Sequence, residues 1–367
     1  MLYSCSLASG TSSASARVGT KRAAPRRGGP VIDIHCHIVS PAAAELVQRS
    51  GVAPVEPMAQ FSNEATRAVG KQQTETVRPQ LTSVERRLAD MDAMGVDIQA
   101  ISPAPPQYYY WTPPEVGRDA ARLINDNIAA TVAAHPDRLV GMGTVPLQAP
   151  EFAVAELERG VKQLGFRGVE ICTNVAGTEL SDARFRPFFA KAEELGVLVF
   201  LHPNGFTEGR RLSDHYFINV IGNPLDSTVA VSHLIFGGVL DAHPRLKICV
   251  AHGGGFLPAY AGRMEHAHGA RSDCRVCIKR KPSHYLKKMY FDTIVFDPAQ
   301  LAYLVEIYGS DHILMGTDYP FDMGMYDPVG FVGGTKKLTA ADRAAILGGN
   351  AARLLKLKKP GSKPTRR

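Results

Sequence analysis

Two histidines separated by one residue, His35 and His37, follow a short apolar run that begins at Val31. Side chains alternate between the faces of a β-strand, so both imidazoles would project together from such a strand, with Cys36 on the other face. Two neutral imidazoles on one face form half of a site for zinc or a similar divalent metal. Taken alone, the pattern is also compatible with a surface turn that binds no metal.

Three further residues suited to metal chemistry end short apolar runs far along the chain. They are His202, His252 and Asp318. If the runs are strands of one parallel barrel, their carboxyl ends meet at one mouth, where active sites of this fold lie. Imidazoles and a carboxylate suit zinc and other borderline divalent metals, and an open coordination position activates a bound water near neutral pH. A histidine beside that water can act as general acid or base.

Eight apolar, often β-branched runs predict strands, and longer amphipathic segments between them predict helices. The expected strands are Val31–His35, Asp97–Ser102, Leu139–Val145, Gly168–Cys172, Val197–His202, Leu246–His252, Lys288–Asp292 and His312–Thr317. The expected helices are Val84–Met94, Asp119–Ala134, Pro150–Leu164, Ala183–Leu195, Pro224–His243, Pro298–Tyr308 and Ala340–Leu355. This alternation predicts an α/β protein with a (β/α)8 TIM barrel. A doubly wound open sheet is the alternative, but no Gly-x-Gly-x-x-Gly follows the first run.

The charge distribution divides the chain into a body and two basic ends. The formal net charge is +7, but residues 1–30 and 356–367 together carry eleven basic and no acidic residues, which leaves about −4 for residues 31–355. A body of this charge argues against nucleic-acid binding. We expect residues 1–30 to form a disordered extension, 31–355 the barrel, and 356–367 a basic tail. We expect residues 40–81 to form a loop inserted after the first strand, and this loop could contain a small antiparallel strand pair.

Hydropathy and cysteine usage predict a cytoplasmic enzyme with reduced thiols. The sequence holds no run of about 18 apolar residues, so we expect no membrane span, and it holds no secretory apolar segment. Six cysteines are scattered along the chain, mostly in apolar runs. Cys274 and Cys277 could hold a second zinc with His266, His268 and His284. Because no second cysteine pair completes such a site, a polar loop with two chance cysteines is the preferred interpretation.

Longer motifs around the strand ends resemble those of a known family. They are Gly143–Pro150, Ala251–Pro258 continuing to Arg263, and Gly316–Phe321. Together with the mouth residues, they make residues 31–355 resemble the amidohydrolase superfamily, and within it the enzymes similar to 2-amino-3-carboxymuconate-6-semialdehyde decarboxylase. The resemblance implies a metal-dependent, non-oxidative carboxy-lyase that acts on an unsaturated or aromatic carboxylic acid. The alternative is a metal-dependent hydrolase or hydratase that acts on a lactone, an amide or a ring-cleavage product.

The resemblance also implies roles for individual residues. The implied metal ligands are His35, His37, His202 and Asp318. The implied catalytic residues are His252, as the acid or base beside the metal-bound water, and Asp318. The expected cofactor is one divalent ion, zinc or alternatively manganese. Binuclear superfamily members carry a carboxylated lysine at the end of strand four, where this chain has Glu170-Ile171-Cys172-Thr173, so one metal is expected rather than two.

Two arginines match the family's substrate-carboxylate clamps. A planar guanidinium binds a carboxylate through two parallel hydrogen bonds, and the resemblance assigns this task to Arg78 and Arg263. Because the family's equivalent of Arg263 reaches the neighbouring subunit's site, the resemblance implies a homodimer. The aromatic run Gln107–Trp111 could line the substrate site or pack in an interface. The segment Asn204-Gly205-Phe206 departs from the family pattern, so the identity of the carboxylic acid stays open.

Overall fold

The structure is a computed structural model that describes residues 29–357. Residues 1–28 of the expected extension and residues 358–367 of the expected tail lie outside the described residues. Within residues 29–357, none of the helices combines the length and the apolar character needed to cross a membrane.

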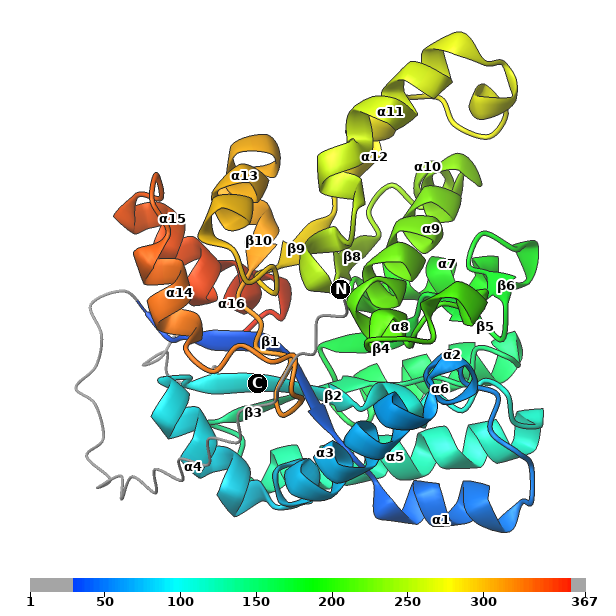
Figure 1. The fold of residues 1–367 in the computed structure, drawn as a ribbon, viewed down its shortest axis with the longest axis vertical. Helices are drawn as coiled ribbons and strands as arrows, with labels where there is room; N and C mark the ends of the chain where they lie inside the picture. Colours follow the sequence, from blue (N-terminus) through cyan, green and yellow to red (C-terminus); the bar gives the residue numbers. More distant parts are fainter. Residues whose placement is uncertain (1–28, 358–367) are drawn as a thin grey trace, which may run out of the picture.

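Eight parallel strands form the sheet, and they neighbour one another in sequence order. The strands are β1 (Ile32–Ile38), β2 (Ile98–Pro103), β3 (Leu139–Gly143), β4 (Gly168–Cys172), β7 (Leu198–His202), β8 (Lys247–Val250), β9 (Tyr290–Asp292) and β10 (Ile313–Leu314). The sheet closes because the chain after β10 bonds back to β1: the His37 amide donates to the Tyr319 carbonyl at 2.8 Å, beside a parallel bridge between Cys36 and Tyr319. The predicted barrel is therefore confirmed (Figure 1).

The helices occupy most of the predicted segments. Those between and after the barrel strands are α5 (Pro114–Ala134), α6 (Pro150–Lys162), α7 (Arg186–Leu195), α8 (Phe217–Val220), α9 (Gly222–Phe236), α10 (Val239–Ala242), α11 (Leu257–Ala270), α12 (Pro282–Leu286), α13 (Pro298–Tyr308), α14 (Pro328–Gly334), α15 (Ala340–Ala344) and α16 (Asn350–Leu354). The helix expected at Pro224–His243 is wrong as one unit, because α9 ends before Gly237 and Gly238 adopts φ 72°. The helix expected at Ala340–Leu355 contains a π-helical turn at Ala345–Gly349.

The insertion after β1 is helical, which corrects the expected loop at 40–81. It contains α1 (Pro41–Arg49), α2 (Pro57–Phe61), α3 (Glu64–Thr82) and α4 (Val84–Met94), and α4 has the predicted bounds. Side-chain caps explain two of the starts, since Ser40 accepts from the Ala43 amide and Asn63 from the Thr66 amide. The optional strand pair is absent from this segment, and the small antiparallel pair in the described chain, β5 (Asn174–Val175) with β6 (Thr178–Glu179), follows β4 instead.

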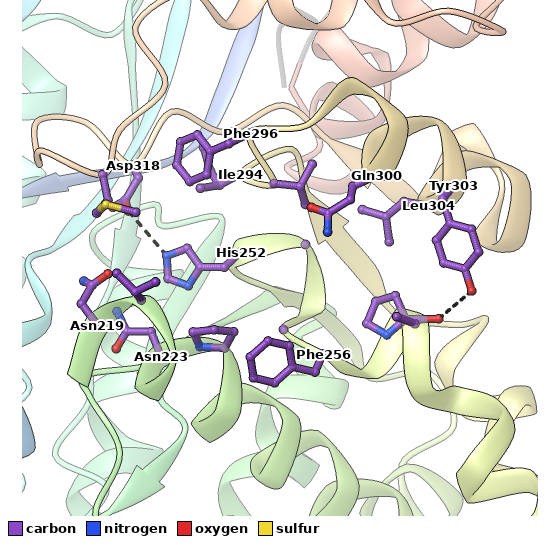
Figure 2. Close-up of a pocket in the computed structure, with 18 of the residues that line it drawn as sticks. Asn219, Asn223, His252, Phe256, Ile294, Phe296, Gln300, Tyr303, Leu304 and Asp318 are labelled. Atoms are coloured by element: carbon purple, nitrogen blue, oxygen red, sulfur yellow. Dashed lines mark hydrogen bonds and ion pairs between the residues drawn. The ribbon is translucent and has the colours of Figure 1, made fainter. Parts of the chain in front are cut away.

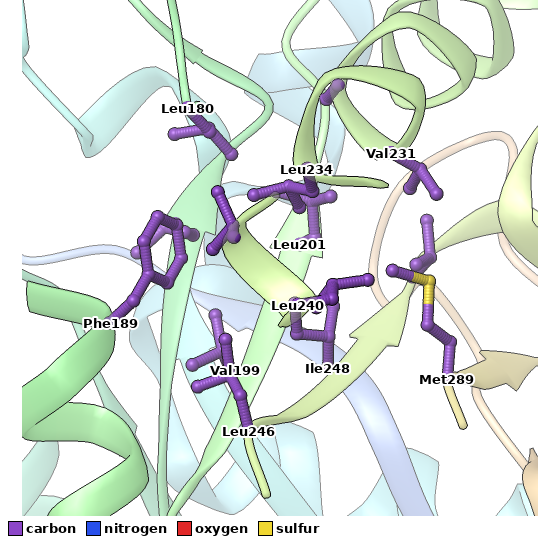
Figure 3. Packing of buried hydrophobic residues seen from close by; sticks show 14 of the residues in the cluster. Leu180, Phe189, Val199, Leu201, Val231, Leu234, Leu240, Leu246, Ile248 and Met289 are labelled. Carbon is purple, nitrogen blue, oxygen red and sulfur yellow. The ribbon is translucent and has the colours of Figure 1, made fainter. Parts of the chain in front are cut away.

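Successive side chains of a barrel strand point alternately toward the surrounding helices and into the barrel. In β7, Val199 and Leu201 belong to the cluster formed with helices α7 and α9, whereas Phe200 belongs to the interior cluster. Figure 3 shows Val199 and Leu201 beside Phe189 of α7 and Leu234 of α9. Each large apolar side chain buried in this way contributes about 1.5–3 kcal/mol. Because His202 is two residues after Phe200, this packing fixes its imidazole on the inner face of the barrel.

Candidate metal centre and its cavity

The end of β1 presents two imidazoles with their free nitrogens toward the mouth. His35 Nδ1 donates to Asp292 Oδ2 at 2.6 Å, and His37 Nδ1 donates to the Pro103 carbonyl at 3.0 Å. Both acceptors lack a proton, so each ring directs its Nδ1–H at the acceptor, which leaves Nε2 as the atom available to a metal. Outer hydrogen bonds of this kind orient the histidines of metal sites. Cys36 packs on the opposite side of the strand in the cluster that includes Ala43, as predicted.

Three ligand atoms converge at this point. The Nε2 atoms of His35 and His37 are 3.1 Å apart, and each is 3.2 Å from Asp318 Oδ1. Atoms bound about 2.0–2.2 Å from one divalent ion lie roughly 3 Å from one another, so the spacing fits a common metal. Lone pairs that converge so closely repel each other unless a positive charge lies among them. The donor set therefore fits a divalent cation.

His202 and His252 complete the cluster from β7 and from the turn after β8. The His202 ring lies 5.0 Å from the His37 ring and 4.9 Å from the His252 ring, measured between centroids. One ligand atom from each of His35, His202, His252 and Asp318 lies within 4.8 Å of the others. His202 is buried, yet within the described chain neither of its ring nitrogens has a hydrogen-bond partner. Buried polar atoms are normally partnered, and a metal ion bound in this cluster would be the partner of one of these nitrogens.

The pKa directions agree with a site that takes up positive charge. Burial lowers the pKa of the His202 imidazole well below its ordinary value, and neighbouring His35 lowers it further, so His202 is neutral. Burial alone would raise the pKa of the Asp318 carboxyl, but the charge of His35 and hydrogen bonds from the histidines hold it well below its usual range. Neutral imidazole and ionised carboxylate are the forms that bind metal. Burial alone would lower the pKa of His35, but Asp318 and Asp292 raise it well above its usual value, so without a metal this ring also holds a proton on Nε2, which a bound cation would replace.

Asp292, the last residue of β9, contacts both His35 and the backbone of the turn that carries His252. Its Oδ2 accepts from His35, while its Oδ1 accepts from the Gly253 amide at 2.8 Å and from the Ile294 amide at 3.1 Å. The turn after β8 is thereby held against the residue that orients His35. Asp292 was not among the residues predicted for the site, although a carboxylate at the end of a predicted barrel strand is a usable signal.

A second buried carboxylate, Asp33, joins the first and last strands behind the site. Asp33 Oδ1 accepts from the amides of His35 and Thr317, each at 3.0 Å, and Oδ2 accepts from the Thr317 hydroxyl at 2.6 Å. The approach is so close that a Cβ added to Gly316 would lie 2.8 Å from the Cβ of His35. Asp33 was not predicted for the site either, because its only signal in the sequence is an acidic residue within an apolar run.

The two residues expected to be catalytic occupy a strained backbone conformation. His252 and Asp318 both have φ 56°, in the left-handed region that non-glycine residues rarely adopt. Such residues cost about 1–3 kcal/mol each and occur where surrounding structure holds them. Their side chains face each other, with His252 Nε2 3.5 Å from Asp318 Oδ2. Both line a cavity of about 500 Å³ that extends away from the metal site (Figure 2).

Other predicted features lie outside this cavity. Arg78 on α3 and Arg263 on α11 are exposed, and neither lines it. The aromatic run 107–111 packs against the barrel and the insertion instead: Tyr108 donates to Glu170 at 2.6 Å and Trp111 to Glu56 at 3.3 Å. Among residues 29–357, the group of side chains with metal-ligand spacing does not include the pair at 274 and 277.

Known proteins share both the sequence signature and the architecture of this chain. The signature of the amidohydrolase family matches residues 32–357. The chain is 36% identical over 272 residues to 2-amino-3-carboxymuconate-6-semialdehyde decarboxylase of Dictyostelium discoideum, which covers 74% of this chain and 76% of that protein. These values place the chain among decarboxylases by sequence.

Two solved structures extend the comparison to the fold. The 5-carboxyvanillate decarboxylase of Sphingomonas paucimobilis has a TM-score of 0.81 at 28% identity and covers 90% of this chain and 99% of its own. Dihydroxybenzoic acid decarboxylase from Polaromonas sp. JS666, solved with manganese and the inhibitor 2-nitroresorcinol, has a TM-score of 0.77 at 26% identity and covers 90% and 97%. With its divalent metal site at the barrel mouth, this chain belongs to the amidohydrolase family, in the branch that contains the metal-dependent carboxy-lyases.

Proposed function

We propose that this protein removes CO2 from an aromatic or muconate-type carboxylic acid without an oxidant, using one divalent metal. The observation that carries the proposal is the convergence of four histidines and one aspartate at the barrel mouth, where His252 and Asp318 also line a largely apolar cavity. Buried imidazoles whose ring nitrogens are available to a metal, next to an apolar cavity, indicate metal-assisted chemistry on an organic substrate. The related decarboxylases support the choice of CO2 release over other metal-assisted reactions.

The ligands in this proposal are His35, His37, His202 and Asp318. We propose zinc as the native ion, with manganese as the alternative, because imidazoles with one carboxylate suit borderline divalent metals. When bound, the cation supplies Lewis acidity that polarises and orients the oxygen atoms of the substrate. A single ion is favoured because the carboxylate on strand four, Glu170, is engaged by the Tyr108 hydroxyl rather than free to bridge two metals.

His252 is the proton donor in this proposal. Its side chain borders both the ligand cluster and the cavity, whereas His35 and His37 are fully buried. His252 gives a proton to the carbon that bears the carboxylate. The carbon–carbon bond then breaks, its electron pair returns to the unsaturated system, CO2 leaves, and solvent restores the proton to His252. Asp318 stays ionised and holds the imidazole by its charge at 3.5 Å.

Arg78 and Arg263 are the proposed carboxylate clamps, and Arg263 acts from a second subunit. Arg263 lies on α11, whose first residues Pro258 and Ala259 line the cavity, yet its own side chain is exposed. A guanidinium so placed can contact a substrate only in another copy of the chain, which favours a homodimer with shared sites. We place the enzyme in the cytoplasm, because the described cysteines form no disulfide and three of them are buried.

The test is a screen of aromatic and muconate-type acids for CO2 release by protein that has been freed of metal and then reloaded. Zinc or manganese should restore activity that chelation removes, and product analysis should show the acid minus its carboxyl group. A product that has gained water, or a lactone or amide that has been opened, would instead show a hydratase or hydrolase on this scaffold. Activity that survives complete metal removal would refute the metal-dependent proposal.

A further inference from the structure

Arg87, on α4 of the insertion, is a buried cation behind the metal centre. Only 1% of its surface is exposed. Its guanidinium donates to the His37 carbonyl, to Gln99 Oε1 at 2.9 Å and to the Gln80 carbonyl at 3.5 Å. All three acceptors are neutral oxygens. Because a charge is costly to bury, these hydrogen bonds must replace the water that the guanidinium loses.

The hydrogen bond from Arg87 completes the anchoring of His37. The His37 amide donates to the Tyr319 carbonyl at 2.8 Å, and the His37 carbonyl accepts from Arg87. The ring Nδ1 is directed at the Pro103 carbonyl. Both backbone groups and one ring nitrogen of this residue therefore have fixed partners, and Nε2 is left to face the other proposed ligands. Functional atoms have to be held to within about 0.5 Å of their working positions.

The same guanidinium lies against the residue that follows Asp318. The distance from Arg87 Cζ to the centroid of the Tyr319 ring is 5.0 Å, which is typical of a cation–π contact. The Tyr319 hydroxyl donates to Asp90, also on α4, at 2.8 Å. Asp318 has a left-handed backbone conformation, which persists only where the surrounding structure holds it. Helix α4 holds the chain one residue away from this strained position.

Gln99, on β2, links Arg87 to the hydrogen bonds behind the site. Its Nε2 donates to Asp33 Oδ2 at 3.0 Å, and the other oxygen of Asp33 accepts from the amides of His35 and Thr317. The oxygen of the Gln99 amide thus serves Arg87 and its nitrogen serves Asp33. Because both ends of this amide are engaged, its orientation is fixed, and it fixes the direction of the guanidinium in turn.

We propose that Arg87 is a positioning residue of the metal centre, through which the insertion holds the segments of His37 and Asp318 at the spacing that one divalent ion requires. This inference rests on the ligand set of the proposed function. Without the guanidinium, the His37 carbonyl is buried without its donor and Tyr319 loses its contact with α4, so the ligand atoms move apart. These contacts lie within one chain and do not depend on a second subunit.

Metal affinity tests this role without relying on turnover. Full-length protein is stripped of metal and titrated with zinc in competition with a chromophoric chelator. We expect Arg87→Met, which keeps much of the side-chain volume but loses the donors and the charge, to bind zinc about tenfold or more weakly than the parent protein. The matched control is Arg86→Met on the same helix, where the side chain is 55% exposed and pairs with Asp90. This control should bind zinc as the parent protein does.

Cobalt distinguishes a change in ligand geometry from a loss of stability. Cobalt(II) accepts the same kinds of ligand as zinc, and its visible absorption depends on the number and arrangement of those ligands. We expect an altered spectrum in Arg87→Met. Arg87→Lys keeps a donor for the His37 carbonyl but lacks the fork that also reaches Gln99, so it should restore part of the zinc affinity and part of the parent spectrum. Urea denaturation of the metal-free variants measures stability separately.

Two results would show that Arg87 does not position the ligands. Parent-like zinc affinity and cobalt spectrum in folded Arg87→Met, whatever its stability, would mean that Arg87 supports the fold alone. An equal loss of affinity in Arg86→Met would mean that any cation on α4 has the same effect. If Arg87→Met does not fold, Arg87→Lys decides, and parent-like affinity in that variant overturns the inference.

Further outcomes separate this inference from the proposed function. A parent protein that binds neither zinc nor manganese would refute the metal-dependent enzyme and the role of Arg87 together. Metal binding that depends on Arg87, in a protein that releases CO2 from none of the acids, would refute the decarboxylase alone and leave the positioning role standing.

Discussion

Asp292 accepts a hydrogen bond from His35 Nδ1 at 2.6 Å, and both side chains are fully buried. The same carboxylate holds the Gly253 amide next to His252. One residue therefore sets the tautomer of a proposed metal ligand and the position of the proposed proton donor. Outer partners of this kind commonly change metal affinity as strongly as some ligands do.

Asp292→Asn should reduce metal affinity by about 10–100-fold. The amide oxygen of the variant can serve the Gly253 and Ile294 amides, which turns its NH2 group toward His35 and forces the ring hydrogen onto Nε2, where the metal should bind. Competition with a chelator measures the affinity, and circular dichroism checks the fold. Asp311→Asn, at an exposed position, is the control. Unchanged affinity in Asp292→Asn would show that the tautomer is set by other contacts.

His252→Ala should keep the metal and lose turnover. The proposed ligand set does not include His252, whereas the carbon that loses CO2 needs a proton from a positioned acid, which typically supplies a factor of 10²–10⁴. Metal content by elemental analysis and initial rates of CO2 release are the two measurements. A variant with near-normal rates would rule out His252 as the proton donor, and one without metal would move His252 into the ligand set.

Asp318→Ala should lose the metal together with activity. Asp318 Oδ1 lies 3.2 Å from both proposed imidazole ligands and is the carboxylate of the set. Removing it leaves only neutral ligands around a doubly charged ion, so the metal-to-protein ratio after gel filtration should fall toward zero. Asp322→Ala, four residues along the same segment, is the control. Retained metal in Asp318→Ala would require another carboxylate to enter the site.

Gly316→Ala should destabilise the protein by about 1–3 kcal/mol. The added Cβ would lie 2.8 Å from the Cβ of His35 and 3.3 Å from the Cβ of Asp292, so β1 and the segment after β10 would have to separate. Urea denaturation of the metal-free protein measures the change without a contribution from ligand binding. Gly333→Ala is the control, because a Cβ there meets no atom within 4 Å. Equal stability of the two variants would contradict the close approach.

Asp226 should make stability fall as the pH rises through the weakly acidic range. Burial raises the pKa of this carboxyl from 3.8 to about 6, although Thr173 and Asn174 hydrogen-bond to it. The folded state thus holds the proton more tightly than the unfolded state, and the stabilisation present below pH 3.8 is lost as the pH rises to about 6. The difference in unfolding free energy between the parent protein and Asp226→Asn should decline by up to about 3 kcal/mol over this range. A pH-independent difference would contradict the raised pKa.

The barrel and the metal centre were predicted mainly from the spacing of a few residues along the chain. Alternation in a strand placed His35 and His37 on one face, and the strand-end positions of His202 and Asp318 implied a common mouth once eight strands were counted. These inferences held because backbone geometry fixes side-chain direction in a strand, and barrel topology fixes which strand ends meet. The insertion at 40–81 was harder, because α1 and α2 are short and the helices of this segment depend on caps such as Ser40 and Asn63 and on packing against the barrel.

By itself, the sequence determined the barrel, the metal chemistry and the five residues that converge at its mouth, since these follow from local periodicity and residue type. Only the tertiary structure decided that Asp292 and Asp33 hold the site, that His252 lines a largely apolar cavity, and that Arg78 and Arg263 are exposed and do not line that cavity. The physical reason is distance along the chain. Asp33 and Thr317 are 284 positions apart, and hydrogen bonds between such residues leave no pattern in either local sequence.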